Sequence, residues 1–319
     1  MVPIYADGEP ARHFPVRRIM EKMIKNSKFL ITGGTGSLGQ TIAKTLLLQG
    51  ASEVRIFSRD ELKQAEMRQS LLQCSIRFYL GDVRDENRLE QAINGVDYVI
   101  HAAALKRIES GEIQPEEVIR TNVLGTMNII EACRKNGIIS CTGISTDKAV
   151  SPINTYGATK MLLEKLFLAA SRNCKTRFSV CRYGNIIASR GSLLDKNSLL
   201  KAVIYNPQMT RFFIDMEAAA TFVIRTLLHS PGGEICVLKM PSYRIDKIIR
   251  EMARKKGLVV TEGIPRQAEK IHEILINPEE TVIARDKGDY FSLSPGIFPC
   301  NLLLSSKSKS SGRISKYEQ

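Results

Sequence analysis

A glycine-rich turn, Thr32-Gly33-Gly34-Thr35-Gly36-Ser37-Leu38-Gly39, places the strictest limit on how this chain can fold. It follows the short apolar run 28–32 and precedes residues 40–49, whose apolar side chains have helical spacing. Glycines at 33, 36 and 39 permit a tight turn, close approach of the backbone to a pyrophosphate, and close packing of helix on strand. Because the turn lies between a strand and a helix, it predicts a dinucleotide-binding unit.

Apolar runs alternate with helical patterns along the first part of the chain. Beyond 28–32 we predict strands at 53–58, 76–80, 98–102, 138–145 and 178–183, separated by helices at 59–72, 84–93, 115–135 and 156–170. This alternation predicts an α/β fold with a Rossmann-type, doubly wound parallel sheet. After residue 190 the pattern is mixed, with helices at 212–228 and 243–256 and a strand at 234–238. These predict a smaller C-terminal mixed α/β lobe that binds substrate.

Composition and charge exclude several classes of protein. The 319 residues are 43% hydrophobic and 25% charged, which is ordinary for a globular chain. No apolar run is long enough to span a membrane, and Arg17, Arg18, Lys22 and Lys25 interrupt the N-terminal segment, so we expect no signal peptide and a cytoplasmic protein. The seven cysteines and four histidines form no metal-binding pattern, so we expect reduced cysteines and no metal. The net charge of +13 fits a solvated basic surface or phosphate-bearing ligands, and no nucleic-acid motif is present.

The residues at the strand ends indicate which dinucleotide binds. Ser58-Arg59-Asp60 ends the second predicted strand, and Lys63 lies one helical turn further on. An acidic residue at this position binds the ribose 2′-hydroxyl of NAD, whereas an arginine suits the 2′-phosphate of NADP. Because Ser58 and Arg59 come first, the sequence favours NADP over NAD. Asp82, after the third strand, can reach the adenine.

Two groups of polar residues near the fifth strand predict proton-transfer chemistry. Tyr156 and Lys160 lie four residues apart, so they share one face of a helix, and the lysine charge is expected to lower the tyrosine pKa. Thr146, Asp147 and Lys148 end the preceding strand. A simple dehydrogenase or epimerase needs only the tyrosine, the lysine and a hydroxyl. An added acid and base side by side therefore indicate proton transfer at further carbons.

With these motifs in place, the sequence resembles the extended short-chain dehydrogenases/reductases, and within them the inverting UDP-N-acetylglucosamine 4,6-dehydratases of flagellin-glycan and capsule pathways. The resemblance covers about residues 28 to 285. It is carried by the glycine turn, by Ser58-Arg-Asp-Glu-Leu-Lys63 and by Ser145-Thr-Asp-Lys148. Pro152-Ile-Asn-Thr-Tyr-Gly-Ala-Thr-Lys160 and Met209-Thr-Arg-Phe212 extend it. The two runs that begin at Ser58 and Ser145 are much more specific than the glycines.

The resemblance implies a role for each catalytic residue. Tyr156 would deprotonate the sugar 4-hydroxyl as hydride passes to NADP, with Thr146 and Lys160 beside it. Lys148 would remove the C5 proton, and Asp147 would protonate the departing 6-hydroxyl. Hydride would return to C6, and Lys148 would reprotonate C5 from the other face. The net reaction is a dehydration for surface polysaccharide or protein glycan biosynthesis, and the NADP stays bound.

The resemblance also implies which residues bind the ligands and how the chain assembles. The UDP-sugar substrate would contact Lys106, Asn185, Arg190, Arg211, Arg266 and Glu269. The chain would pair through helices 115–135 and 156–170 into a homo-oligomer, either a dimer or a hexamer. The cofactor-binding residues would be Gly33, Gly34, Thr35, Gly36, Ser37, Leu38, Gly39, Ser58, Arg59, Asp60, Glu61, Lys63, Asp82, Val83, Ala102, Ala103, Lys106, Asn122, Tyr156 and Lys160.

Departures from the family pattern leave alternatives open. The usual Arg-Pro-Gly-Glu-Lys segment reads Arg266-Gln-Ala-Glu-Lys270, and the loop 191–210 is several residues shorter. A nucleotide-sugar 4-epimerase or reductase, a retaining dehydratase, and a non-catalytic NADP sensor are the other readings. We predict an N-terminal extension outside the fold at 1–26, an NADP-binding domain at 27–190, a substrate lobe at 191–303 with segments that return to that domain, and a disordered tail at 304–319.

Overall fold

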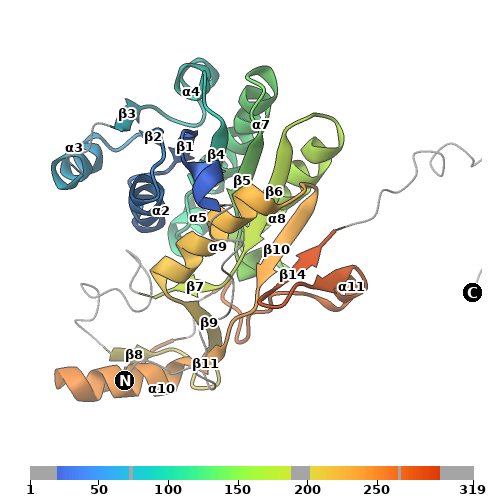
Figure 1. Cartoon of the computed structure of the whole chain (residues 1–319). Coiled ribbons are helices and arrows are strands. Elements are labelled where there is room, and N and C mark those ends of the chain that lie inside the picture. Colours follow the sequence, from blue (N-terminus) through green and yellow to red (C-terminus); the bar gives the residue numbers. More distant parts are fainter. Residues whose placement is uncertain (1–19, 72–74, 188–201, 265–266, 295–319) are drawn as a thin grey trace, which may run out of the picture.

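A nine-stranded sheet forms the centre of the molecule in the computed structural model, which describes residues 20–71, 75–187, 202–264 and 267–294. Its strand order is β13-β14-β10-β6-β5-β4-β1-β2-β3 (Figure 1). The strands are β1 (Lys28–Thr32), β2 (Glu53–Ser58), β3 (Ile76–Leu80), β4 (Tyr98–His101), β5 (Ser140–Ile144), β6 (Arg177–Arg182), β10 (Glu234–Leu238), β13 (Ala284–Asp286) and β14 (Tyr290–Leu293).

The order β3-β2-β1-β4-β5-β6 is the doubly wound arrangement that the sequence predicted. All pairs from β3 to β10 are parallel, whereas β14 runs antiparallel to both β10 and β13. Strand order reverses between β1 and β4, so a crevice is expected at the carboxyl ends of these two strands. The glycine turn follows β1 directly and therefore lies at this point.

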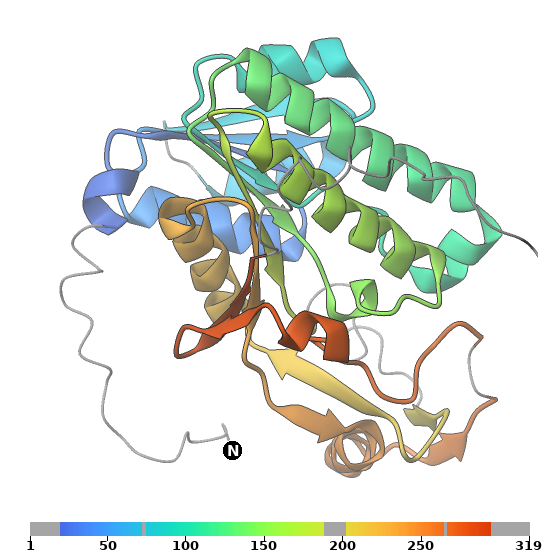
Figure 2. The ribbon, with the colours of Figure 1, turned by 90° about the vertical axis from the view of Figure 1, so that its right-hand side faces the viewer.

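Helices cover both faces of the sheet, and each face has its own apolar core (Figure 2). On one face pack α4 (Glu86–Ile93), α7 (Gly125–Lys135) and α8 (Thr155–Arg172). On the other pack α2 (Ser37–Leu48) and α9 (Met216–His229), while α3 (Glu61–Ser70) borders β2. Asp60, Asp85, Asn154 and Asp215 each begin a helix by accepting a hydrogen bond from a backbone N–H of its first turn.

A smaller group of elements lies past the carboxyl ends of the central strands, at one end of the molecule (Figure 1). It contains β7 (Asn185–Ile186), β8 (Ala202–Ile204), β9 (Thr210–Ile214), β11 (Ser242–Arg244), β12 (Val260–Glu262) and α10 (Ile245–Lys256). A third apolar cluster, which includes Phe213 and Ile249, packs α10 against β8 and β9. The chain then returns through α11 (Pro278–Thr281) to β13 and β14 of the central sheet.

Three sequence predictions were wrong in part. Residues 20–24 are helical and Ile24 is fully buried against the α2 face, so the chain enters the fold before residue 27. Residues 212–214 belong to β9 rather than to the following helix, and residues 243–244 belong to β11. In the last two cases alternating side chains pair across β9 and β11, and this pairing overrides the helical spacing.

The predicted long helix at 115–135 is present but is not α-helical throughout. It consists of α6 (Pro115–Ile119), the π-helical turn η1 (Arg120–Leu124) and α7, and α5 (Ile108–Ile113) precedes it. Pro115 occupies the first turn, as expected for a residue without an N–H. Among the described residues, no helix is long and apolar enough to cross a membrane.

Candidate active site

The glycine turn lies directly on the loop that follows β4. Gly33 has φ of 67°, which favours glycine, and a side-chain carbon there would come within 2.8 Å of the Ala103 backbone. At Gly39 such a carbon would lie 2.6 Å from the Gly34 Cα atom, so α2 packs closely on the turn. No side chain caps the start of α2 and its first turn carries no acidic residue. Its backbone N–H groups therefore suit a pyrophosphate, and the turn fits a dinucleotide.

Hydroxyl and charged side chains surround the end of β2. The Thr35 and Ser58 hydroxyls hydrogen-bond at 2.8 Å, and Asp60 pairs with Lys63 as it caps α3. The Arg59 guanidinium lies 3.3 Å from the Asp82 carboxylate, and its side chain is about half exposed. The structure thus brings the residues predicted for the adenosine end together. Arg59 keeps enough solvent access to bind an anion there.

A buried histidine joins β1 and β4 at the crevice. His101 Nδ1 and the Thr32 hydroxyl are 2.8 Å apart, and His101 Nε2 and the Thr126 hydroxyl are 3.2 Å apart. Burial, and secondarily the nearby Lys160 ammonium, lower the pKa of His101 to about 3. His101 is therefore neutral at physiological pH, and its two hydrogen bonds fix the carboxyl ends of β1 and β4 without adding charge there.

Asn122 uses its whole amide to connect two loops of the site. Its Oδ1 accepts from the Leu105 N–H at 2.8 Å, and its Nδ2 donates to the Leu105 carbonyl at 2.9 Å and to the Thr159 hydroxyl at 3.0 Å. The Asn122 side chain thereby ties the segment after β4 to the helix that carries Tyr156 and Lys160. Its predicted cofactor contact stays a prediction.

The acid–base pair predicted from the sequence is in direct contact. Lys148 Nζ donates to Asp147 Oδ1 at 3.0 Å, and the Thr146 hydroxyl donates to the same oxygen at 2.9 Å. Asp147 is fully buried, yet its Oδ2 atom has no hydrogen-bond partner. A buried carboxylate oxygen without a partner is costly. The arrangement therefore leaves one strong acceptor free for a ligand hydroxyl.

Tyr156 and Lys160 lie on the first two turns of α8, as the spacing predicted. The Thr146 hydroxyl hydrogen-bonds to the Tyr156 side chain, and Lys160 Nζ donates to the Ile144 carbonyl at 2.6 Å. The expected lowering of the Tyr156 pKa was wrong for this structure. Burial and the Asp147 carboxylate raise the pKa of Tyr156, and they outweigh the Thr146 hydrogen bond, which lowers it.

Burial of the Lys160 charge lowers the stability of the fold, so a variant without this charge is expected to be more stable than the wild type. Burial lowers the pKa of Lys160 to about 8, although Glu164 partly opposes this shift. The unfolded chain thus binds the proton more tightly, so the penalty is complete below pH ~8 and disappears as the pH rises to ~10.5. At pH 7 the penalty is about 3 kcal/mol. Lys160→Met also loses one hydrogen bond, so we expect a net gain in unfolding free energy of about 1–2 kcal/mol.

Urea unfolding of Lys160→Met and of the wild type at pH 7 and pH 10 measures this effect. The gain is expected at pH 7 and should shrink at pH 10, while turnover is lost. The matched control is Lys44→Met on the exposed side of α2, which should change neither quantity. A variant less stable than the wild type at pH 7 would contradict the buried-charge explanation.

Four of the six residues predicted to bind substrate lie within the described part of the chain, at three separate places. Asn185 lies beside the acid–base pair, because Lys148 Nζ is 3.5 Å from its Oδ1. Arg211 is buried and donates to Glu269 at 2.8 Å and to three backbone carbonyls, so these two residues hold each other. Lys106 is exposed after β4. Arg190 and Arg266 lie outside the described residues.

Sequence reasoning missed a second set of charges around Lys148. Glu273 is only 5% exposed, and its Oε1 lies 3.9 Å from Lys148 Nζ, while Lys270 Nζ lies 3.2 Å from its Oε2. It also missed Arg182, which is fully buried and pairs with Glu164 and Glu280. The available signal was charge within an apolar stretch, because Glu273 stands among Ile271, Ile274 and Leu275.

Ala268 has a backbone conformation that favours glycine, and the resembled family carries glycine at this position. Its φ is 58°, and its carbonyl accepts a hydrogen bond from Asn154 Nδ2 at 3.0 Å. The left-handed region costs an L-residue about 1–2 kcal/mol, partly offset by the greater freedom of an unfolded glycine. We therefore expect Ala268→Gly to raise the unfolding free energy by about 0.5–1 kcal/mol.

Thermal or urea unfolding measures how Ala268→Gly changes the unfolding free energy. The control is a substitution that is expected to change it in the opposite direction. The same substitution at Ala65, an exposed position within α3, should lower the unfolding free energy by about 1 kcal/mol, since glycine weakens a helix interior. Equal destabilisation at both positions would show that Ala268 is not strained.

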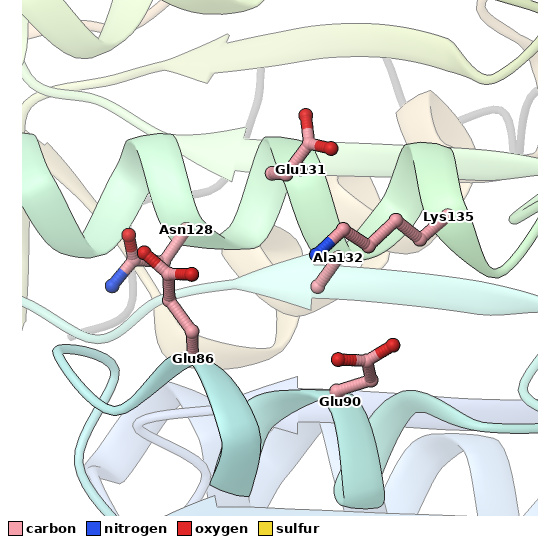
Figure 3. Close-up of a pocket in the computed structure, with 6 residues that line it drawn as sticks. All are labelled: Glu86, Glu90, Asn128, Glu131, Ala132 and Lys135. Atoms are coloured by element: carbon pink, nitrogen blue, oxygen red, sulfur yellow. The ribbon is translucent and has the colours of Figure 1, made fainter.

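A small hollow between α4 and α7 lies apart from these residues (Figure 3). Its volume is about 10 Å³, which is room for about one water molecule. None of the predicted site residues lines it. Its lining side chains are Glu86, Glu90, Asn128, Glu131, Ala132 and Lys135.

The chain is similar in sequence to one protein family and to enzymes that act on nucleotide sugars. The model of a family described as polysaccharide biosynthesis protein matches residues 29–295. The chain is 42% identical over 285 residues to the UDP-N-acetylglucosamine 4,6-dehydratase (inverting) of Campylobacter jejuni strain 81-176, covering 86% of this chain and 85% of the relative. It is 39% identical over 286 residues to the UDP-glucose 4-epimerase of Rickettsia akari, with coverages of 85% and 84%.

Two solved structures have the same fold. Pen from Bacillus thuringiensis superposes with a TM-score of 0.81 at 30% identity, covering 86% of this chain and 89% of that chain. The dTDP-glucose 4,6-dehydratase DesIV from Streptomyces venezuelae, solved with NAD and TYD bound, superposes with a TM-score of 0.71 at 19% identity, with coverages of 79% and 89%. The second similarity is one of fold alone.

Proposed function

We propose that this chain, which belongs to the polysaccharide biosynthesis protein family, is a C5-inverting UDP-N-acetylglucosamine 4,6-dehydratase. The observation that carries the proposal is the direct contact of Lys148 with Asp147 beside Thr146, Tyr156 and Lys160. An acid and a base that share a hydrogen bond are what an elimination across C5 and C6 needs. The Campylobacter relative carries this activity in its name.

The proposed reaction assigns a proton transfer to Tyr156 and to Asp147, and two to Lys148. Tyr156 takes the proton of the sugar 4-hydroxyl while the C4 hydride would pass to a bound nicotinamide dinucleotide and later return to C6, and the resulting ketone makes the C5 hydrogen acidic. Lys148 removes that hydrogen, while Asp147 donates a proton to the 6-hydroxyl so that the C6–O bond breaks and water leaves. The free Oδ2 atom of Asp147 is the natural contact for this hydroxyl. Lys148 finally returns a proton to C5 from the opposite face.

The cofactor in this proposal is a nicotinamide dinucleotide, which supplies the hydride acceptor and donor. The close-packed glycine turn and the uncapped start of α2 support a pyrophosphate at this point. Ser58, Arg59 and Lys63 at the end of β2 favour NADP, because an exposed guanidinium matches a 2′-phosphate. Mass spectrometry of the nucleotide released on denaturation distinguishes NADP from NAD.

Substrate binding and assembly complete the proposal. The UDP-sugar would lie between the carboxyl ends of the central strands and the smaller group of elements from residue 202 onward, in contact with Lys106, Asn185 and the Arg211–Glu269 pair. Exposed apolar side chains along η1, α7 and α8 support association of copies through these helices as a dimer or hexamer, and they include Leu124, Met127 and Leu162. We place this activity in the cytoplasm, where nucleotide sugars are made.

A UDP-sugar 4-epimerase is the second candidate, because the Rickettsia relative carries that name. Epimerisation at C4 uses the tyrosine, the lysine and a hydroxyl, which are also present here. Epimerisation needs neither Asp147 nor Lys148, so it does not explain why these two charged side chains are buried next to each other. The two candidates also differ at C5, since only the dehydration exchanges the hydrogen on that carbon.

Incubation of the purified protein with UDP-N-acetylglucosamine in D₂O, followed by NMR, tests both candidates. A 4-keto-6-deoxy L-arabino product with deuterium at C5 supports the inverting dehydratase. A D-xylo product would overturn the role given to Lys148 in inversion. A 4-epimer without deuterium at C5 would favour the epimerase. No reaction, even with NADP added and other UDP-sugars tried, would reject the proposal.

A further inference from the structure

We propose that Glu273, held by Lys270, is a positioning residue that controls whether Lys148 is charged. This inference rests on the proposed function, since it concerns the residue assigned to C5. Glu273 lies in none of the sequence motifs singled out above. Together with Asp147, it is nevertheless one of two buried carboxylates within 4 Å of the Lys148 amine in the part of the chain that the structure describes.

The four side chains form a row of alternating charges. Asp147 Oδ1 lies 3.0 Å from Lys148 Nζ, which lies 3.9 Å from Glu273 Oε1, and Glu273 Oε2 lies 3.2 Å from Lys270 Nζ. Lys270 Nζ also donates to the Val150 carbonyl at 2.6 Å, so its position is fixed. All four side chains are at least 87% buried, so solvent screens these charges little.

Glu273 is held in place from both ends of its segment. Arg211 binds Glu269 and the carbonyls of Lys270 and Ile271 on one side. On the other side Arg182, fully buried in β6, donates to the Leu275 carbonyl and to Glu280. A carboxylate fixed in this way acts on the Lys148 amine as a permanent neighbour.

The row explains how one lysine can serve as a base and then as an acid. Transfer of one proton from Lys148 Nζ to Asp147 produces a neutral amine and a carboxylic acid, which are the two forms that the elimination needs. This transfer breaks one N–H bond, forms one O–H bond and requires no proton from solvent. The ammonium form is needed later, to return a proton to C5. Glu273 favours the ammonium form, and Lys270 weakens that preference.

Removal of the Glu273 charge is therefore expected to move the pH profile of the enzyme in one direction. Among the described residues, the uncharged Asn185 of β7 also lies within 3.5 Å of Lys148 Nζ. In Glu273→Gln the neutral amine is favoured, so the acidic limb of the pH profile of kcat/KM should move to lower pH.

The test measures kcat and kcat/KM against pH, with C5 deuterium incorporation, for the wild type and four variants. Glu273→Gln should shift the acidic limb to lower pH, and Lys270→Met should shift it to higher pH. Glu273→Asp keeps the charge and should restore a profile close to that of the wild type. The matched control is Glu279→Gln, an exposed carboxylate of the same segment, which should leave the profile unchanged.

The outcomes separate this inference from the function on which it rests. A wild type that dehydrates the sugar, with Glu273→Gln and Lys270→Met profiles identical to its own, would overturn the role of Glu273 alone. A wild type that forms no dehydrated product would overturn the proposed function and this inference with it. If Glu273→Gln does not fold, as thermal unfolding would show, the opposite shift expected for Lys270→Met decides the matter.

Discussion

Asp147→Asn is expected to lower formation of the dehydrated sugar by roughly 10²–10⁴-fold, because the variant loses the acid that releases the 6-hydroxyl. Oxidation at C4 should not be lost with it. The Asp147 carboxylate raises the pKa of Tyr156, so its removal lowers that pKa and leaves more of the tyrosine ionised and able to accept the 4-hydroxyl proton. In this variant Lys148 can no longer pass its proton to Asp147 and must release it to solvent, after which it should still remove and return the C5 hydrogen of the ketone. The variant is therefore expected to stop between oxidation and elimination.

NMR of the sugar recovered from D₂O distinguishes this arrest from general damage. We expect unreacted substrate that carries deuterium at C5, with little 4-keto-6-deoxy product. The control is Glu90→Gln, an exposed carboxylate beside the hollow of Figure 3, which should turn over like the wild type. Normal product formation by Asp147→Asn would remove the acid role. Loss of product without C5 exchange would mean that Asp147 is needed before elimination.

Tyr156→Phe is expected to abolish the first step as well, with a loss of about 10²–10⁴-fold in turnover. The phenol hydrogen-bonds to the Thr146 hydroxyl and is the group assigned to deprotonate the 4-hydroxyl. Without it, neither C5 deuterium nor dehydrated product should form. The two variants thus differ in C5 exchange, although both lose product.

A tyrosine far from the site provides the control for this loss. Tyr98 is buried at the amino-terminal end of β4, where its ring stacks on Phe29. Tyr98→Phe removes the same atom and should keep full turnover. C5 exchange in Tyr156→Phe equal to that of the wild type would show that another group deprotonates the 4-hydroxyl.

The central sheet was predictable from sequence because its signals are local. Strands β1, β2, β3 and β10 have the predicted bounds, since each is a short run rich in apolar residues. The second lobe was less predictable, because β9 and β11 exist only through their pairing with each other. Ile24 was missed for a related reason, since its burial depends on a core made by α2 and β2.

The candidate site was predictable to the extent that its residues follow strand ends. Strand ends placed Thr146, Asp147 and Lys148 correctly beside Tyr156, since parallel strands bring their carboxyl ends to one edge. Glu273 could not be placed, because its segment has no periodicity and more than 120 residues separate it from Lys148 along the chain. The predicted lowering of the Tyr156 pKa was wrong for an energetic reason, because burial and the Asp147 carboxylate raise this pKa and outweigh any effect of Lys160.

The π-helical turn η1 lies between α6 and α7, and its one extra residue sets how the side chains of α6 are rotated relative to those of α7. A π turn holds about one residue more than an α turn, so it shifts everything before it relative to everything after it. Deleting one residue from this turn would restore regular α-helix and rotate α6 by about 100° relative to α7. Asn122 would then face away from Leu105 and Thr159. Chains of this fold that differ in length by one residue here are therefore expected to differ in how the loop after β4 is held.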